Sequence, residues 1–286
     1  EPNDHAYQAV MMAGGVQYNG VIDDESDEDW FTFILESDTV VDLKLERIPQ
    51  NRTMSLSIFD SAQKMLAVYN SRLGTESMNI RTELDSGLYY VRLTANAPFQ
   101  EQMYGLTVNM KHKIAGFIDI EHNWAREAIV NLVEQEVVKG YGDYTFRPNA
   151  PLMRSEAVAM IVRAFGLSEQ QDIRYPDVAT SHWAWQDIAR AAKAGIITGY
   201  PDGTFRPDQY VTRVEMAQML GNALQLEPLE RDPGFRDITA DYWAGGMLAA
   251  LKQNKILTGY PDGTFRPNDT AARAEFAHLL YKALQQ

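Results

Sequence analysis

The sequence predicts a multidomain chain in which an all-β antiparallel sandwich is followed by a helical half. Two hydrophobic periodicities and one internal repeat support this prediction. Up to about residue 112, apolar residues alternate with polar ones, which is typical of strands. From about residue 115 they recur at helical spacing, and one stretch of sequence returns three times. The composition, 45% hydrophobic and 23% charged, is that of a globular protein.

The first 112 residues contain short segments rich in β-branched and aromatic residues. Turn signals separate these segments, as in the run Asp85-Ser86-Gly87. Val41 and Leu43 are typical of the pattern, since they lie two residues apart and would share one face of a strand. The spacing predicts the strands of a sandwich at 30–36, 40–46, 54–60, 64–70, 78–84, 88–94 and 104–110.

The second half repeats a tryptophan, a short helical run, Gly-Tyr and then Phe-Arg-Pro. The tryptophans Trp124, Trp183 and Trp243 are 59 and 60 residues apart. Each unit has the pattern of a helix, a loop and a second helix. We therefore predict a first domain at 1–112, followed by repeats at 116–167, 175–226 and 235–286.

The repeated loop is clearest in ITGYPDGTFRPDQYVTRVE, which begins at residue 197. Its Pro-Asp-Gly sequence, which includes Asp202 and recurs at Asp262, predicts a tight turn closed by a glycine with positive φ. Thr212 and Glu215 have the spacing of a capping box at the start of the next helix. Tyr144 replaces the turn glycine in the first repeat, so that turn is either strained or of another type.

An arginine opens the second helix of every repeat, at Arg154, Arg213 and Arg273. The helix dipole disfavours a cation there, so we expect each arginine to have a partner. One candidate is an internal carboxylate ahead of each tryptophan. The other is an external anion, because a helix N-terminus with a guanidinium binds carboxylate or phosphate well. The residues leave both open; the internal candidates are Asp119, Asp177 and Asp237.

The repeated aromatic residues allow two interpretations. A tryptophan at the start of an amphipathic helix is more often buried in the core than exposed as a platform. A tryptophan or tyrosine ring beside a polar groove can also stack against a sugar. Tyr200 and Tyr260 follow a glycine and precede a turn, so we expect them to be more exposed than the tryptophans.

Taken together, the motifs of residues 116–286 resemble S-layer homology (SLH) domains. The resemblance implies an all-α pseudo-threefold trimer of helix–loop–helix SLH repeats that anchors an exported protein non-covalently to the bacterial cell wall. The implied partner is a wall polysaccharide, either a pyruvylated secondary polymer or a peptidoglycan-linked glycan, held in grooves between repeats. The expected glycan-binding residues are Arg154, Arg213, Arg273, Trp124, Trp183, Trp243, Tyr200, Tyr260, Asp202 and Asp262.

Acidic residues near the start of the chain form a second candidate site. Oxygens from two distant segments can hold Ca²⁺, although a solvated acidic edge beside a strand explains the same spacing. The Glu-Pro-Asn-Asp start, the Asp-x-Asp-Trp-Phe strand and a later Gly-x-Tyr-Tyr-Val strand resemble the bacterial pre-peptidase C-terminal β-sandwich. Some relatives of that domain bind Ca²⁺, and no other cofactor is expected. The ligands would be Glu1, Asn3, Asp27 and Asp29.

Other classes of function fit less well. The net charge of −13 argues against nucleic acid as a partner, and no apolar run is long enough to span a membrane. No catalytic motif is present, so we do not expect an enzyme. The alternatives are an assembly or adhesion module with S-layer protein neighbours, or an accessory substrate-binding region of a larger secreted hydrolase. The EPND opening suggests a processed product, secreted to the cell-wall surface.

Overall fold

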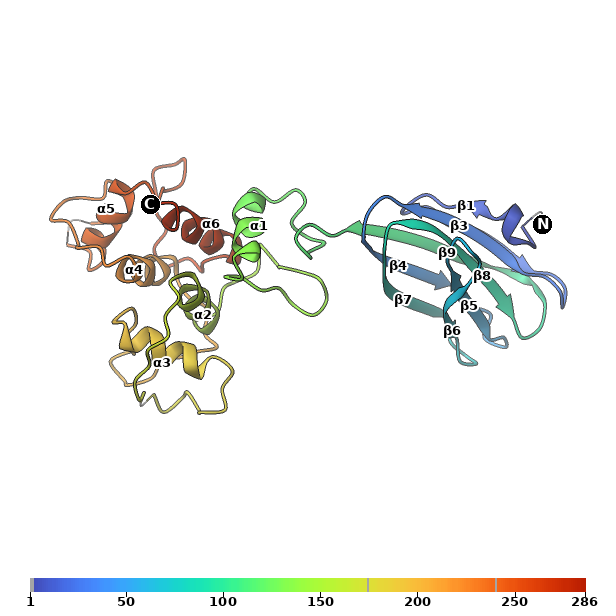
Figure 1. The fold of residues 1–286 in the computed structure, drawn as a ribbon, viewed down its shortest axis with the longest axis horizontal. Coiled ribbons are helices and arrows are strands. Elements are labelled where there is room, and N and C mark those ends of the chain that lie inside the picture. Colours follow the sequence, from blue (N-terminus) through green and yellow to red (C-terminus); the bar gives the residue numbers. More distant parts are fainter. Residues whose placement is uncertain (1–2, 174, 240) are drawn as a thin grey trace. The chain divides into compact units, whose positions relative to one another are not determined.

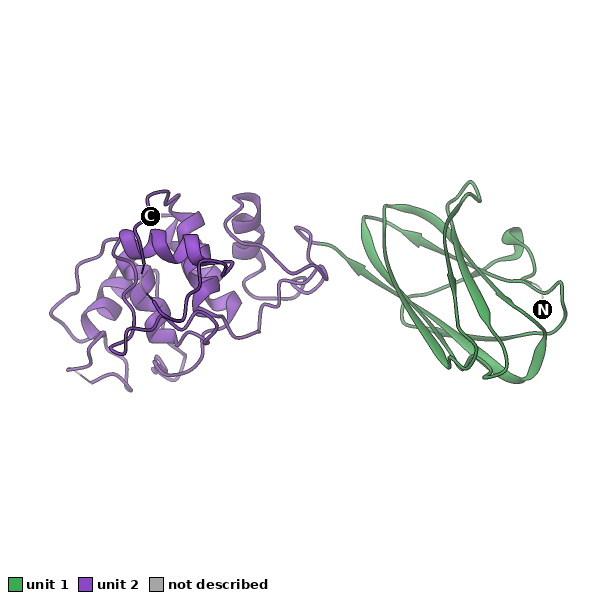
Figure 2. Cartoon of the chain, turned by 90° about the horizontal axis from the view of Figure 1, so that it is seen from below, with its two compact units in different colours: residues 1–113 green, residues 114–286 purple. Residues whose placement is uncertain are grey.

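A computed structural model describes residues 3–173, 175–239 and 241–286. The chain divides into two compact units, Glu1–Lys113 and Ile114–Gln286 (Figure 2). Each unit has its own hydrophobic core.

The N-terminal unit is built from two β-sheets (Figure 1). One sheet has the strand order β1-β3-β8-β5-β6, and the other has the order β2-β9-β4-β7. A short 3₁₀ helix, Ala6–Gln8, precedes the first strand. The strands are β1 Val10–Met11, β2 Gln17–Ile22, β3 Asp29–Leu35, β4 Thr39–Glu46, β5 Met54–Phe59, β6 Met65–Asn70, β7 Ser77–Leu84, β8 Gly87–Ala95 and β9 Phe99–His112.

The core of this unit lies between the two sheets. Val41 and Leu43 on β4 are at most 1% exposed, while Lys44 between Leu43 and the next core residue points to solvent. In the other sheet, Val91 and Leu93 on β8 are fully buried. The alternation predicted from the sequence therefore selects the inner faces of both sheets.

The prediction of a purely antiparallel sandwich is wrong at one edge. β1 pairs with β3 in parallel, with Val10 opposite Phe31. Neither β1 nor β2 was predicted from the sequence. β1 has only two residues, and β2 contains Gly20, where the pairing with β9 becomes irregular, so neither carries a clear period-two pattern.

The C-terminal unit contains six helices within its described residues. The first helix of each repeat has nine residues and the second has eleven, and the second always begins at the repeated arginine. The helices are α1 Arg126–Glu134, α2 Arg154–Ala164, α3 Trp185–Lys193, α4 Arg213–Ala223, α5 Gly245–Gln253 and α6 Arg273–Ala283.

Helices from different repeats pack together around one core. α3 packs on α2, α5 packs on α4, and α1 packs on α6, so each first helix lies against the second helix of another repeat. The phenylalanine of each Phe-Arg-Pro motif is fully buried. These residues are Phe146, Phe205 and Phe265. Each repeat therefore depends on its neighbours to cover its apolar residues.

Three segments just ahead of α2, α4 and α6 close a ring of backbone hydrogen bonds. The Leu152 amide donates to the Ala271 carbonyl at 2.9 Å, and the Ala271 amide donates to the Val211 carbonyl at 3.0 Å. The Val211 amide completes the ring by donating to the Leu152 carbonyl at 2.9 Å. All three residues are fully buried, so the ring lies inside the unit and every repeat contributes one donor and one acceptor.

The predicted fold class is wrong in a second respect, because the C-terminal unit is not an all-α trimer. More than half of it lies outside the six helices, in long loops that carry the repeated motifs. Isolated β-bridges also join the repeats, as between Met153 and Tyr210. The chain is therefore a mixed structure, with two sheets in one unit and short helices joined by ordered loops in the other. Helical periodicity identified the helices but could not reveal that the loops make bridges.

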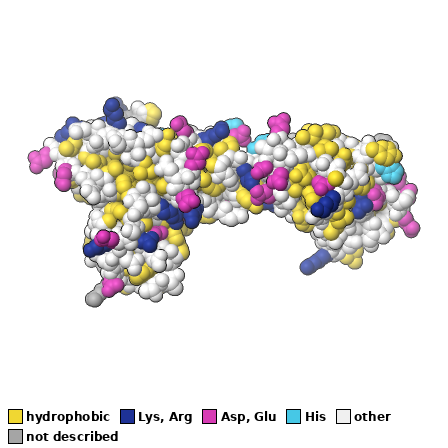
Figure 3. All heavy atoms as spheres, viewed as in Figure 1, with side chains coloured by type: hydrophobic (Ala, Val, Ile, Leu, Met, Phe, Trp, Pro, Cys, Tyr) yellow, Lys and Arg dark blue, Asp and Glu magenta, His cyan; other side chains and the backbone are white. Residues whose placement is uncertain are grey.

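The surface gives two further observations. No helix among the described residues is long and apolar enough to cross a membrane. On the face seen in Figure 3, acidic and basic side chains are interspersed with hydrophobic ones.

Candidate functional site

The loop between the two helices of each repeat is held by its own polar residues. In the second repeat, Asp202 Oδ1 accepts hydrogen bonds from the Thr204 amide at 3.0 Å and the Thr204 hydroxyl at 2.6 Å. Asp202 Oδ2 pairs with the Arg206 guanidinium at 2.8 Å. These bonds hold the pKa of Asp202 far below its usual range. Asp262 repeats the arrangement with Thr264 and Arg266. Both predicted glycan-binding aspartates are thus about half exposed and already bonded within their loops.

The turn glycine is required in two repeats and replaced in the other. Gly203 and Gly263 have φ of 83° and 82°. Tyr144, at the same place in the first repeat, has φ of 63°. Of the two possibilities that the sequence left open, the structure therefore has the strained turn, because a residue with a Cβ atom is disfavoured in this conformation.

A carboxylate from the segment ahead of each tryptophan closes the loop. Asp177 accepts from the amides of Phe205 at 2.9 Å and Arg206 at 2.6 Å. Asp119 and Asp237 make the same pair of bonds in the other repeats. The prediction that these aspartates pair with the helix-opening arginines is therefore wrong, because both of their oxygens are engaged by backbone amides.

The capping box is complete only in the second repeat. Thr212 Oγ1 accepts from the Glu215 amide at 3.4 Å, and Glu215 Oε2 accepts from the Thr212 amide at 2.9 Å. In the other repeats Met153 and Ala272 replace the threonine. There the only remaining bond of the box is the one that the backbone amide of Met153 or Ala272 donates to the glutamate.

The helix-opening arginines are buried and reach into another repeat. Arg213 Nε donates to the Phe265 carbonyl at 2.9 Å, and its Nη1 pairs with Glu275 at 2.6 Å. Arg154 makes the same contacts with Phe205 and Glu215. The three arginine residues are only 4 to 7% exposed. Their internal partner is thus the capping glutamate of another repeat.

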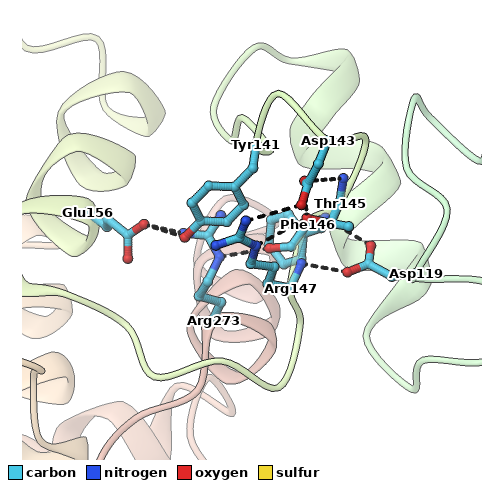
Figure 4. Close-up of polar contacts among 8 residues, drawn as sticks. All are labelled: Asp119, Tyr141, Asp143, Thr145, Phe146, Arg147, Glu156 and Arg273. Carbon is cyan, nitrogen blue, oxygen red and sulfur yellow. Dashed lines mark hydrogen bonds and ion pairs between the residues drawn. The ribbon is translucent and has the colours of Figure 1, made fainter. Parts of the chain in front are cut away.

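Arg273 completes this cycle by returning to the first repeat. It contacts the Phe146 carbonyl at 2.8 Å and Glu156 at 2.8 Å (Figure 4). It also donates to the Lys139 carbonyl at 3.2 Å. The first amides of α2, α4 and α6 also donate to loop carbonyls of another repeat, as Arg273 does to Ala150 at 3.0 Å. The first amides of these helices are therefore already hydrogen-bonded within the protein.

Each capping glutamate also accepts a hydrogen bond from the Gly-Tyr tyrosine. The Tyr200 hydroxyl donates to Glu215 Oε1 at 2.6 Å, and the Arg154 guanidinium lies 4.7 Å from the centre of the Tyr200 ring. Burial and the Glu215 hydrogen bond raise the pKa of Tyr200 to about 12. Burial alone would raise the pKa of Glu215, but the bonds from Tyr200 and Thr212 and the charge of Arg154 lower it.

Three grooves open beside these clusters, and we number each by the repeat that supplies its tyrosine and glutamate. Every groove takes its arginine from a second repeat and its tryptophan from the third. Their volumes are about 410, 170 and 690 Å³ for grooves 1, 2 and 3. The shared residues are Tyr141, Glu156, Arg273 and Trp183 in groove 1; Tyr200, Glu215, Arg154 and Trp243 in groove 2; and Tyr260, Glu275, Arg213 and Trp124 in groove 3.

The exposure of the aromatic residues is the reverse of the prediction. Trp124, Trp183 and Trp243 are 57 to 64% exposed, whereas Tyr200 and Tyr260 are half-buried. The alanine after each tryptophan enters the core instead, which leaves the larger ring on the surface. An exposed tryptophan at the edge of a groove offers a flat apolar face to a ligand.

The candidate Ca²⁺ residues are only partly brought together. Asp29 is fully buried; its Oδ1 accepts from Asn3 at 2.7 Å and its Oδ2 from Tyr104 at 2.5 Å. Asp27 accepts from the Asp23 amide at 2.6 Å, and Glu1 lies outside the described residues. Among the residues that the structure describes, no group of three or more His, Cys, Asp or Glu side chains could hold a metal ion. Ca²⁺ binding stays a prediction.

Three arginines beside the tyrosine rings were not predicted as site residues from the sequence, and of these only Arg147 is among the described residues that line a groove. Arg147, Arg206 and Arg266 have φ near 60° and lie over the tyrosine rings, with Arg147 3.8 Å from the centre of Tyr141 (Figure 4). Their recurrence in Phe-Arg-Pro could have signalled a role. Lys139, Arg163 and His278 also line grooves, but they differ between repeats and carry no such signal.

The C-terminal unit is thus made of three cyclically joined repeats, with grooves between them. Residues 117–158, 174–217 and 234–277 each match the S-layer homology domain. The three repeats are S-layer homology domains, as the motifs predict. The predicted repeats begin within one residue of the matched stretches but run nine residues past the end of each, and the predicted domain boundaries stay predictions.

Two similar curated proteins come from Acetivibrio thermocellus. Over 164 residues the chain is 34% identical to Cell surface glycoprotein 1, covering 52% of this chain and 7% of that protein. Over 158 residues it is 32% identical to a Cellulosome-anchoring protein, covering 52% of this chain and 35% of that protein. The chain thus spans well under half the length of these relatives.

Among solved structures, the pre-peptidase C-terminal domain of a collagenase from Bacillus anthracis is similar. It is 15% identical, with a TM-score of 0.30, and covers 35% of this chain and 94% of that chain.

Proposed function

We propose that the C-terminal unit anchors a surface protein to the bacterial cell wall by binding a wall polysaccharide in its grooves. The observation that supports this most is the recurrence of one arrangement in three places. Each groove sets an exposed tryptophan beside a half-buried tyrosine and a buried arginine–glutamate pair. A polymer of repeating sugars can engage such a set at several points, which raises the overall affinity without tight binding in any one groove.

The ligand that fits best is a secondary wall polysaccharide bearing carboxylates, such as pyruvate ketals. The tryptophan face suits a sugar ring, and the cations at the grooves suit a carboxylate. The net charge of −13 would repel an acidic polymer over the whole surface. Salt screens that repulsion more than it weakens contacts in a partly buried groove, so the binding rate should depend on salt.

The arginines are poor choices for testing this proposal, because their removal would disturb the folded unit. The exposed tryptophans are better probes. We expect the combined variant Trp124→Ala, Trp183→Ala and Trp243→Ala to lose at least about tenfold in affinity for purified wall sacculi. Tyr210→Ala is the matched control, since Tyr210 is 49% exposed and is not among the residues that line the three grooves.

Sacculi stripped of secondary polymer, and sacculi lacking pyruvate, complete the test. Loss of binding by the parent protein on stripped sacculi supports the polymer as partner. Unchanged binding there would contradict the proposal and favour a protein partner in the wall, as an assembly module would have.

A further inference from the structure

The three grooves share a tyrosine, a glutamate, an arginine and a tryptophan, but they differ in charge at two equivalent positions. The residue before Gly-Tyr is Lys139 in groove 1, where the other repeats have threonine. The residue nine positions after the helix-opening arginine is Arg163 in groove 1 and Asn222 in groove 2. Lys282, the third equivalent, does not line groove 3 itself but lies with Lys252 and Lys255 in an adjoining pocket that shares Tyr260 with groove 3.

Groove 1 therefore has two cations, Lys139 and Arg163, that do not belong to the set of residues shared by all three grooves. Its arginines Arg273 and Arg147 are held by Glu156 at 2.8 Å and by Asp143 at 3.1 Å. Within the described part of the chain, the ion pairs at this groove include neither Lys139 nor Arg163. Lys139 is exposed and Arg163 is half-buried, so both charged groups are accessible to a ligand.

Groove 2 has the opposite character. Among the described residues that line it, the only lysine or arginine is Arg154, which is paired with Glu215 at 3.2 Å. Asn222, at the position of Arg163, donates to the Ile196 carbonyl at 3.0 Å and accepts from Gln218 at 2.9 Å. Apart from the Arg154–Glu215 pair, the Asn222 and Gln218 side chains of this smaller groove are neutral, and both are hydrogen-bonded within the protein.

Groove 3 is larger, and among the described residues that line it Arg213 is the only lysine or arginine. His278 lies there with its ring centre 5.0 Å from that of Trp124. Burial, with the charge of Lys282, lowers the pKa of His278, so its ring is mostly neutral near pH 7. Arg213 is paired with Glu275.

We infer that groove 1 is the groove selective for negatively charged groups, and that Lys139 and Arg163 determine this selectivity. This inference rests on the proposed function. The ligand class is a glycan carrying a carboxylate or a phosphate, while grooves 2 and 3 take uncharged parts of the same polymer. Charge-assisted hydrogen bonds from two free cations are shorter and stronger than bonds from neutral donors.

The test uses the full chain and purified wall polysaccharide in two forms, native and with its carboxylates chemically reduced to alcohols. The variant Lys139→Thr with Arg163→Asn gives groove 1 the residues of groove 2. We expect about a tenfold or greater loss of affinity for the native polymer. We also expect that carboxyl reduction, which weakens binding by the parent, has little further effect on this variant.

The control Lys193→Thr with Arg231→Asn removes the same charge from exposed positions that line none of the three grooves among the described residues. It should bind like the parent, and unchanged melting temperatures should confirm that both variants are folded. Competition by pyruvate more than by inorganic phosphate would identify a carboxylate, and the reverse order a phosphate.

Three results would overturn the inference in distinguishable ways. If the parent binds native polymer but the groove 1 variant keeps the same affinity and the same sensitivity to carboxyl reduction, groove selectivity is refuted and anchoring stands. If the parent binds neither form of the polymer, the proposed function fails as well. An equal loss of affinity in the control variant would also refute the inference about groove 1, because the effect would then follow net charge alone.

Discussion

Replacing Arg273 with alanine should destabilise the C-terminal unit, whatever the unit binds. The side chain is buried and joins the last repeat to the first through Phe146, Glu156 and the Lys139 carbonyl. Its guanidinium also lies 4.7 Å from the ring centre of Phe146. Alanine fills none of this space and leaves Glu156 without its cation.

The expected loss follows from the geometry. Removing one partner of a buried ion pair costs about 3–5 kcal/mol, because the other charge stays buried without compensation. Glu156 retains bonds from Tyr141 and the Met153 amide and its side chain is 16% exposed, so the lower end applies. A loss of about 3 kcal/mol lowers the melting temperature of a unit of this size by about 6–12 °C.

Calorimetry or thermal circular dichroism at neutral pH measures this loss. Arg147→Ala is the matched control, because Arg147 lies over the same tyrosine but its ion pair with Asp143 is exposed. Such a pair contributes about 1 kcal/mol or less. If Arg273→Ala melts within about 2 °C of the control, the arginines do not hold the repeats together, and the reasoning is refuted.

Four further measurements test other parts of the structure. Gly203→Ala should cost about 1 kcal/mol in denaturant unfolding because its φ is 83°, whereas Gly142→Ala, in open space without positive φ, should be neutral; equal effects would contradict this. The folded pKa of Glu215 is lowered, so its contribution to stability is present above the unfolded value of 4.5 and is lost as pH falls through the folded pKa; Glu215→Gln should flatten the acid limb of the stability curve. NMR titration should place the pKa of His278 below 6.5, and a value at or above it would be inconsistent with the buried ring. Calcium should raise the melting temperature of the N-terminal unit if the predicted ligands bind it, and melting that ignores both calcium and chelator would count against that site.

The sequence predicts the position of most elements because periodicity is local. Seven strands of the N-terminal unit lie close to their predicted segments, while β1 and β2 were missed because they carry little alternation. The capping box was predicted at Thr212 for the same reason, since its two partners are three residues apart.

The partners of the arginines could not be predicted because they are distant. Arg213 pairs with a glutamate 62 residues away, and Arg273 with one 117 residues away. The repeated spacing shows only that each arginine has an equivalent environment. The prediction that the tryptophans are buried was also wrong. The alanine after each tryptophan fills the core, and this overrides the general preference of tryptophan for burial.

The loop and capping motif of the second repeat contributes residues to two different grooves. Its tyrosine and glutamate line groove 2, whereas its Arg213 lines groove 3. An intact motif therefore supports parts of two different sites, and a substitution in it would be felt in both.

The closed ring of backbone hydrogen bonds through Leu152, Val211 and Ala271 has a consequence for engineering. In a linear array, a repeat can be removed from an end with the loss of one interface. Here every repeat has two neighbours, so deleting any one should break two interfaces and expose unpaired amides. Changing the order in which the repeats are connected breaks none. A circular permutant whose C-terminal unit begins at the second repeat should therefore keep all three grooves, provided that the new linker can span the two joined ends.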